Sequence, residues 1–210
     1  MEFQYSCFIS YRHTKQYKGK TYTERFVEDL KAELELRVAQ EVFRDIERLK
    51  GGEYYNEEIA TALCRSLCMV VLYWPTYFST QHTFCAREFK AMEALEKRRL
   101  ELVADPLERN KGLIIIVALR DFDRIPLDIK STRLCKDFEA YTLRPNMRED
   151  PDFQRDIWEI SRYIADRCKY FQKTEPDTLH DCSTFRFPTA ESIAPWMNLI
   201  CSLEPSFVNR

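Results

Sequence analysis

Short apolar and β-branched segments occur at intervals along the chain, and each is typical of a β-strand. Residues 113–119 (LIIIVAL) form the clearest of them, because an uninterrupted apolar run indicates a parallel strand that is covered on both faces. The other segments that we predict to be strands are residues 3–11, 40–44, 67–73 and 138–143.

Helical spacing occupies the intervals between the predicted strands. In residues 23–38, apolar side chains recur every four residues, which indicates the buried face of a helix. We predict further helices over residues 56–66, 84–102 and 151–171, the last with a proline near its start. Alternating strands and helices predict an α/β fold, a flavodoxin-like doubly wound sheet of five mainly parallel strands with helices on both faces.

The periodic pattern ends near Gln172, after which prolines recur. We therefore predict one domain over residues 1–171 and a C-terminal tail over residues 172–210 that packs on the domain or extends it. Within the tail, the apolar side chains expected to cap the domain are Trp196, Leu199 and Ile200.

Composition excludes several classes of protein. The net charge of −2 provides no basic surplus for direct binding to nucleic acid. The apolar run of residues 113–119 is far too short to span a membrane, and residues 1–20 lack the apolar stretch of a signal peptide. The eight cysteines include no CxxC pair, so reduced cysteines in a cytoplasmic protein are expected.

Unusual residues follow the ends of successive predicted strands. Arg12 follows the first strand, residues 45–52 follow the second, and residues 84–89 end the loop that follows the third. In an open parallel sheet, ligands bind outside the carboxyl ends of the strands. These segments should therefore converge on one cleft.

The same segments resemble motifs of the TIR (Toll/interleukin-1 receptor) domain family. Residues 8–12 (FISYR) look like the first box of that family, and residues 45–52 (DIERLKGG) are similar to its BB loop. Residues 84–89 (FCAREF) are similar to its W-C-x-x-E-L box, with Phe in place of Trp. The resemblance covers about residues 1–171 and implies the TIR fold. It also implies one of two activities, since many TIR domains cleave NAD whereas others only assemble signalling complexes.

Glu88 is the candidate catalytic residue. Cleavage of the nicotinamide–ribose bond of NAD releases a leaving group that is already cationic, so it needs no general acid, and one carboxylate that stabilises the oxocarbenium charge could suffice. Phe84 shares a helix face with Glu88 and would provide an aromatic plate for the substrate. The alternative is that Glu88 is a solvated helix residue. The resemblance implies the catalytic role, since this is the position of the family's catalytic glutamate.

Other residues near the predicted cleft are candidates for binding substrate. Arg12 could pair with the NAD phosphates or, alternatively, with a loop acid at the surface. Tyr54 could pack against a nucleotide, a neighbouring subunit or the core. Trp74 and Tyr77 could line the cleft or belong to the core, and Tyr11 lies in the first box.

The BB-loop-like segment is a candidate for assembly. It is polar, and its glycines suit a turn that could gate the ligand site. The resemblance implies multimers formed through this loop, and head-to-tail contacts of this kind can grow into filaments. The residues assigned to assembly are Asp45, Glu47, Leu49, Gly51 and Gly52.

Other chemistries have little support in the sequence. The chain has no GxGxxG and no GxxxxGK[ST], and its three histidines and scattered cysteines show no zinc spacing. We expect no metal and no cofactor, with NAD as a substrate. Tyr73 stands where the family often carries Ser, and residues 81–82 lengthen the next loop, so the pose of the substrate and the choice of product stay open.

The predicted function is that of a cytoplasmic NAD glycohydrolase in defence or signalling. Its products would be nicotinamide and ADP-ribose or a cyclic ADP-ribose isomer. The expected partners are NAD and further copies of the chain, with an upstream sensor or a downstream effector protein left open, and neither nucleic acid nor membrane. The alternatives are a non-catalytic TIR interaction module that self-associates through its BB loop and, more distantly, a flavodoxin-like small-ligand receiver.

Overall fold

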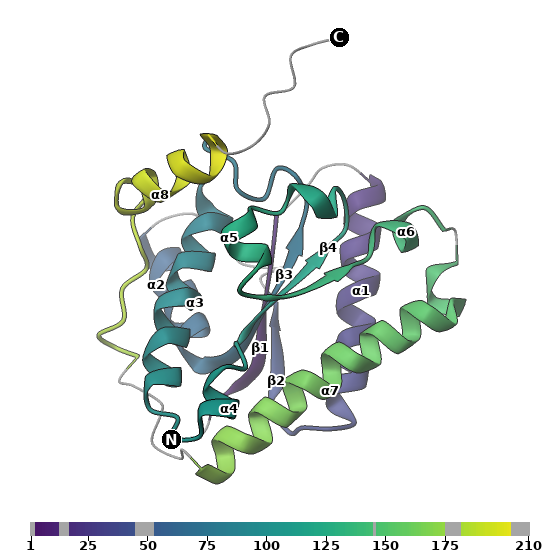
Figure 1. Cartoon of the computed structure of the whole chain (residues 1–210), viewed down its shortest axis with the longest axis horizontal. Helices are drawn as coiled ribbons and strands as arrows, with labels where there is room; N and C mark the ends of the chain where they lie inside the picture. Colours follow the sequence, from purple (N-terminus) through teal and green to yellow (C-terminus); the bar gives the residue numbers. More distant parts are fainter. Residues whose placement is uncertain (1–2, 13–16, 45–52, 145, 175–181, 203–210) are drawn as a thin grey trace.

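A parallel sheet of five strands in the order β2-β1-β3-β4-β5 forms the centre of the computed structural model (Figure 1). The structure describes residues 3–12, 17–44, 53–144, 146–174 and 182–202. All four strand pairings are parallel, which confirms the predicted flavodoxin-like α/β fold class. The strands are β1 (Tyr5–Tyr11), β2 (Glu41–Arg44), β3 (Ser66–Tyr73), β4 (Ile114–Ala118) and β5 (Leu134–Asp137).

The middle strands are the apolar core of the sheet. Every residue of β3 and β4 is buried, as the uninterrupted apolar runs predict for strands covered on both faces. The strand order reverses at β1, because the chain crosses from β2 back to β3 on its other side. Tyr11 pairs with Leu72, so the carboxyl ends of β1 and β3 lie side by side at the position where open sheets bind ligands.

Helices cover both faces of the sheet. Helix α1 (Tyr17–Glu35), which begins earlier than predicted, packs with α7 (Pro151–Thr174), whereas α2 (Glu53–Arg65) packs with α3 (Phe84–Glu101) (Figure 1). The short helices, none of them predicted, are α4 (Pro106–Arg109), η1 (Phe122–Arg124), α5 (Leu127–Lys130), α6 (Glu139–Thr142) and η2 (Met147–Glu149).

The prediction of a last strand over residues 138–143 is wrong. Strand β5 ends at Asp137, and the following residues form the helical turn α6. The carboxylate of Asp137 accepts a hydrogen bond from the backbone N–H of Glu139 at 2.9 Å, which stabilises the start of this turn. Phe138 and Tyr141 are both buried because helical spacing places them on the same side. Their apolar pattern therefore belongs to a helical turn.

The C-terminal tail contains a helix that the pattern did not predict, α8 (Ala190–Ser202), which packs against α3. Pro195 lies inside it, which masks the helical signal in the sequence. The ring of Trp196 stacks on Phe89 with centroids 5.8 Å apart, and Ile200 is buried. Leu199 is 56% exposed, so the expectation that it caps the domain is wrong.

A disulfide joins the tail to the domain, so the prediction that the cysteines are reduced is wrong for Cys64 and Cys182, whereas the other six are free thiols. It links Cys64, near the end of α2, to Cys182, with the Cα atoms 5.7 Å apart and 118 positions between them in sequence. A disulfide requires Cα atoms within about 7 Å, and this proximity arises only when the tail folds back over α2. The sequence spacing of the two cysteines therefore carried no signal.

Reduction of the Cys64–Cys182 disulfide is expected to lower the free energy of unfolding by about 2–4 kcal/mol. The cross-link closes a long loop and so restricts the unfolded chain. Denaturant unfolding with and without dithiothreitol measures the effect, and Cys182→Ser should reproduce it. Cys135→Ser, which changes a thiol on β5, is the matched control. An unfolding midpoint that does not respond to reductant contradicts the prediction.

Candidate active site

Glu88 lies in the first turns of α3 with its side chain directed toward the sheet. It is only 4% exposed, and its Oε2 accepts a hydrogen bond from Ser10 Oγ of β1 at 2.5 Å. The alternative that Glu88 is a solvated helix residue is therefore wrong. A buried carboxylate that is hydrogen-bonded at the carboxyl end of a central strand has the position expected of a functional group.

Tyr77 continues the hydrogen-bonded group behind Glu88. It lies in the loop between β3 and α3, is fully buried, and places its hydroxyl 2.5 Å from Ser10 Oγ. Burial raises the pKa of Tyr77 well above its ordinary value, and the charges of Cys85 and Glu88 raise it further. The phenol therefore keeps its proton at neutral pH and is available as a hydrogen-bond donor.

Cys85 adjoins Glu88 but is not suited to act as a nucleophile. Burial raises the pKa of Cys85 well above its ordinary value, Glu88 raises it further, and Arg12 opposes these effects. The reactive form of cysteine is the thiolate, so Cys85 remains an unreactive thiol at neutral pH. The carboxylate of Glu88 is thus the ionisable group of this cluster with catalytic potential.

Arg12 lies just beyond β1 and contacts the same loop as Tyr77. Its Nη1 donates a hydrogen bond to the carbonyl oxygen of Thr76 at 3.1 Å. Arg12 directly follows the end of β1, and Glu88 is hydrogen-bonded to Ser10 near the end of the same strand, so the structure brings the two residues to one end of the sheet. The predicted convergence of the first and third motifs on this end is therefore seen among the described residues.

Phe84 lies next to the C-terminal segment, in an arrangement that the sequence did not reveal. Its ring centroid is 5.2 Å from that of Phe187, and the guanidinium of Arg87 lies 5.5 Å from the Phe84 ring and 4.4 Å from the Phe187 ring. The Nε of Arg87 donates to the carbonyl oxygen of Pro188 at 2.5 Å. The role of Phe84 as an aromatic surface on which the substrate stacks stays a prediction. The Phe84 ring is also in contact with Phe187 of the tail.

A cavity of about 470 Å³ lies between α2 and this C-terminal segment. It is large enough for a small ligand. Its lining is polar as well as aromatic, and it includes Asn56, Thr61, Arg87, Arg186 and Phe187 but not Glu88.

The remaining predicted site residues either pack toward β2 or against the core, or lie outside the residues that the structure describes. The hydroxyl of Tyr11 accepts a hydrogen bond from Arg44 Nε at 3.4 Å, so its ring packs toward β2. Trp74 is half-buried against the core. The assembly candidates Asp45, Glu47, Leu49, Gly51 and Gly52, and the side chain of Tyr54, lie outside the residues that the structure describes.

Sequence reasoning missed Ser10 as a partner of Glu88 and saw Tyr77 only as a cleft-lining or core residue. One signal was present: Ser10 is a polar residue that directly follows the apolar run of residues 7–9 (CFI) in the predicted strand. A polar side chain in such a run needs a hydrogen-bond partner, although the sequence cannot say which.

Two features are absent from the described part of the chain. No three His, Cys, Asp or Glu side chains gather there as ligands for a metal ion. None of the described helices is long and apolar enough to cross a bilayer.

The fold and the site together define a flavodoxin-like α/β protein with a buried, hydrogen-bonded carboxylate at the carboxyl end of its central strands. No protein-family model and no curated protein matches the chain. Among solved structures, it matches the TIR domains in the activated Roq1 resistosome that directly recognises the pathogen effector XopQ. The match has 18% sequence identity and a TM-score of 0.35, and it covers 92% of this chain and 98% of that one.

This match is to TIR domains, the family whose motifs the sequence resembles. The flavodoxin-like fold class is established by the strand order of the chain itself.

Proposed function

We propose that this chain is a TIR-domain NAD glycohydrolase. It would cleave the nicotinamide–ribose bond to give nicotinamide and ADP-ribose or a cyclic ADP-ribose isomer. The observation that carries the proposal is the placement of Glu88, which is buried and held by Ser10 where the first and third TIR-like motifs meet. This end of the sheet is where doubly wound folds bind their ligands.

The chemistry of the site suits a leaving group that needs no acid. Most glycosidases pair a general acid with a second carboxylate. Two ionisable side chains that respond to the charge of Glu88, those of Tyr77 and Cys85, have raised pKa values and keep their protons. A single carboxylate with a fixed position in a water-poor site could stabilise the developing oxocarbenium charge, because preorganised charges act strongly in a low dielectric.

Other described residues near Glu88 would bind the rest of the substrate. Arg12 carries a guanidinium that forks well onto phosphate oxygens, and its charge lowers the pKa of Cys85, three positions before Glu88. Phe84 would stack against the nicotinamide riboside. In this role Arg12 would also link the substrate to the loop that carries Tyr77, through its contact with Thr76.

Nicotinamide release from NAD by the purified protein tests the proposal. Chromatography should show nicotinamide together with ADP-ribose or a cyclic isomer, and mass distinguishes the two products because cyclisation consumes no water. NADH is a matched control, since its dihydronicotinamide is not a cationic leaving group and should not be released. No release from NAD over a wide range of protein concentrations would overturn the proposed activity.

The second candidate function is a non-catalytic TIR module that acts through self-association. Two observations support it. Glu88 is only 4% exposed, and Phe84 is in contact with Phe187, so a substrate would have little access to these two side chains. Light scattering that shows assembly, in a protein that releases no nicotinamide, would favour this candidate. For either function we propose a cytoplasmic role in defence or signalling, with an upstream sensor or a downstream effector as a further partner.

Substitutions of Phe84 test whether its ring stacks on the substrate or only packs against neighbouring side chains. Phe84→Ala should lower kcat/KM for NAD by about fivefold or more, because stacking of a base on an aromatic ring contributes about 1–3 kcal/mol. Phe84→Trp keeps a flat ring and should stay close to the wild type. Phe187→Ala is the control for the loss of the contact with the tail. Equal turnover by the Ala and Trp variants would show that Phe84 only packs.

A further inference from the structure

Three buried side chains form a hydrogen-bonded chain behind the candidate catalytic carboxylate. Ser10 Oγ lies 2.5 Å from Glu88 Oε2 and 2.5 Å from the hydroxyl of Tyr77. Ser10 is 1% exposed, Tyr77 is 0% exposed and Glu88 is 4% exposed, so bulk water does not compete for these hydrogen bonds.

The number of available protons fixes which group donates in each of these two hydrogen bonds. An ionised carboxylate can only accept, and a serine hydroxyl has one proton to donate. Ser10 therefore donates to Glu88, and Tyr77 donates to Ser10. Because burial raises the pKa of Tyr77, its proton is retained at neutral pH. A hydroxyl that donates to an ionised carboxylate makes a charge-assisted hydrogen bond, which is stronger than one between neutral groups.

A strand holds the hydroxyl of Ser10 in place, and a turn with packed aromatic rings holds that of Tyr77. Ser10 lies within β1 and pairs with Val71 of β3. The backbone N–H of Tyr77 donates to the carbonyl oxygen of Trp74 at 2.8 Å, and the Tyr77 ring packs edge-on against Phe78 with centroids 4.8 Å apart. Functional groups on such supports are held more precisely than groups on unsupported loops.

We infer that Ser10 and Tyr77 are positioning residues that orient the Glu88 carboxylate for NAD cleavage. This inference rests on the proposed function. Neither hydroxyl needs to touch the substrate, because each acts through Glu88. Loss of either hydroxyl would let the carboxylate turn away from the ribose, and a small misplacement of a catalytic group lowers the rate strongly.

The test separates kcat from KM in Ser10→Ala and Tyr77→Phe. Loss of a residue that supports a catalytic group typically lowers activity by about 10–100-fold, and we expect a decrease of this size in kcat for Ser10→Ala. Tyr77→Phe, one hydrogen bond further away, should lower kcat less. KM should change by less than about twofold in both, because an interaction that matters only in the transition state leaves substrate binding intact.

Two residues provide matched controls. Ser6 is a buried serine of the same strand whose hydroxyl donates to the carbonyl oxygen of Glu41, and Tyr163 is a half-buried tyrosine of α7 whose hydroxyl donates to the carbonyl oxygen of Gly112. Ser6→Ala and Tyr163→Phe remove hydroxyls of the same kind and should keep the wild-type kcat. If they lower kcat as much as Ser10→Ala and Tyr77→Phe do, the effect is structural and the inference is overturned.

A double-variant cycle distinguishes failure of this inference from failure of the proposed function. In a Glu88→Gln background, Ser10→Ala should have little further effect on kcat, since its partner charge is already gone. If the wild type releases no nicotinamide, the proposed function fails, and a cycle of Ser10→Ala with Glu88→Ala, which removes the acceptor, is measured on unfolding midpoints. Shifts of the midpoint that are non-additive for these two substitutions support the hydrogen-bonded pair, whereas additive shifts overturn it. Should Ser10→Ala not fold, Tyr77→Phe takes its place in the cycle.

Discussion

Glu88→Gln is expected to lower the rate of NAD cleavage by at least about a hundredfold, the loss seen when a preorganised electrostatic group is removed. The amide keeps the shape of the side chain, and its oxygen can still accept the hydrogen bond from Ser10. The negative charge that would stabilise the oxocarbenium ion is lost. The effect should therefore appear in kcat, with the fold unchanged.

The matched control is Glu101→Gln, the same chemical change at an exposed position at the end of α3. It should leave both the rate and the unfolding midpoint at wild-type values. Nicotinamide release and circular dichroism are measured on all three proteins. Wild-type turnover by Glu88→Gln would exclude Glu88 as the catalytic residue.

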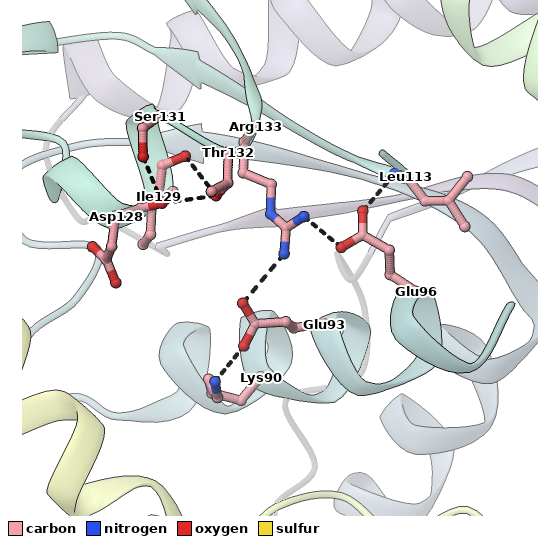
Figure 2. Close-up of polar contacts among 9 residues, drawn as sticks. All are labelled: Lys90, Glu93, Glu96, Leu113, Asp128, Ile129, Ser131, Thr132 and Arg133. Atoms are coloured by element: carbon pink, nitrogen blue, oxygen red, sulfur yellow. Dashed lines mark hydrogen bonds and ion pairs between the residues drawn. The ribbon is translucent and has the colours of Figure 1, made fainter. Parts of the chain in front are cut away.

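The second large effect is expected at Arg133, whose guanidinium lies between two carboxylates of α3. Its Nη1 lies 2.6 Å from Oε2 of the buried Glu96, and its Nη2 donates to Glu93 at 3.2 Å (Figure 2). Glu96 also accepts a hydrogen bond from the backbone N–H of Leu113 at 2.6 Å, next to the start of β4. This group of charges therefore fixes α3, which carries Glu88, against the sheet.

The segment that carries Arg133 is itself held by side chains. The Oγ1 of Thr132 donates to the carbonyl oxygen of Asp128 at 2.7 Å, and Ser131 Oγ donates to the same carbonyl oxygen at 3.3 Å (Figure 2). These bonds satisfy the carbonyl oxygen of Asp128 in the short helix α5, because no further helical turn follows that could supply a backbone N–H. The guanidinium is therefore presented to Glu96 from an ordered support.

Arg133→Met is expected to lower the free energy of unfolding by about 3–5 kcal/mol, because removing one partner leaves a buried charge uncompensated. Methionine retains an apolar stem, so the loss of packing is small. Arg155→Met is the control, since Arg155 forms an exposed ion pair with Asp152 whose contribution should be only about 0–1 kcal/mol. Urea unfolding measures both variants, and equal losses would contradict the role given to Arg133.

The difference in the free energy of unfolding between the wild type and Arg133→Met should also depend on pH. Burial is the main cause that raises the pKa of Glu96, whereas Arg133 and the backbone N–H groups of Leu113 and Ile114 oppose it. A carboxyl group with a raised pKa binds more protons in the folded state than in the unfolded state, so its contribution to stability falls as pH rises. Without Arg133 the pKa of Glu96 rises further. The deficit of Arg133→Met should therefore shrink as the pH is lowered from neutral toward the range in which Glu96 is protonated.

The sequence by itself determined the fold class and most of its elements. Strands β1 to β4 and helices α2, α3 and α7 were predicted close to their observed bounds, because burial on one or both faces leaves a local pattern of apolar residues. The convergence of Arg12 and Glu88 followed from the topology, since parallel strands end at the same edge of the sheet. Helical spacing placed Phe84 and Glu88 on one face of α3.

Only the tertiary structure decided which side chains meet. Ser10 and Glu88 are 78 positions apart, Ser10 and Tyr77 are 67 apart, and Cys64 and Cys182 are 118 apart. No local pattern records such contacts, because they arise when separate elements pack on the same sheet. For the same reason, the short strand β5 and helix α8 were missed: β5 has no fully buried residue, and the stacking of Trp196 on Phe89 that holds α8 depends on a partner far away in the sequence.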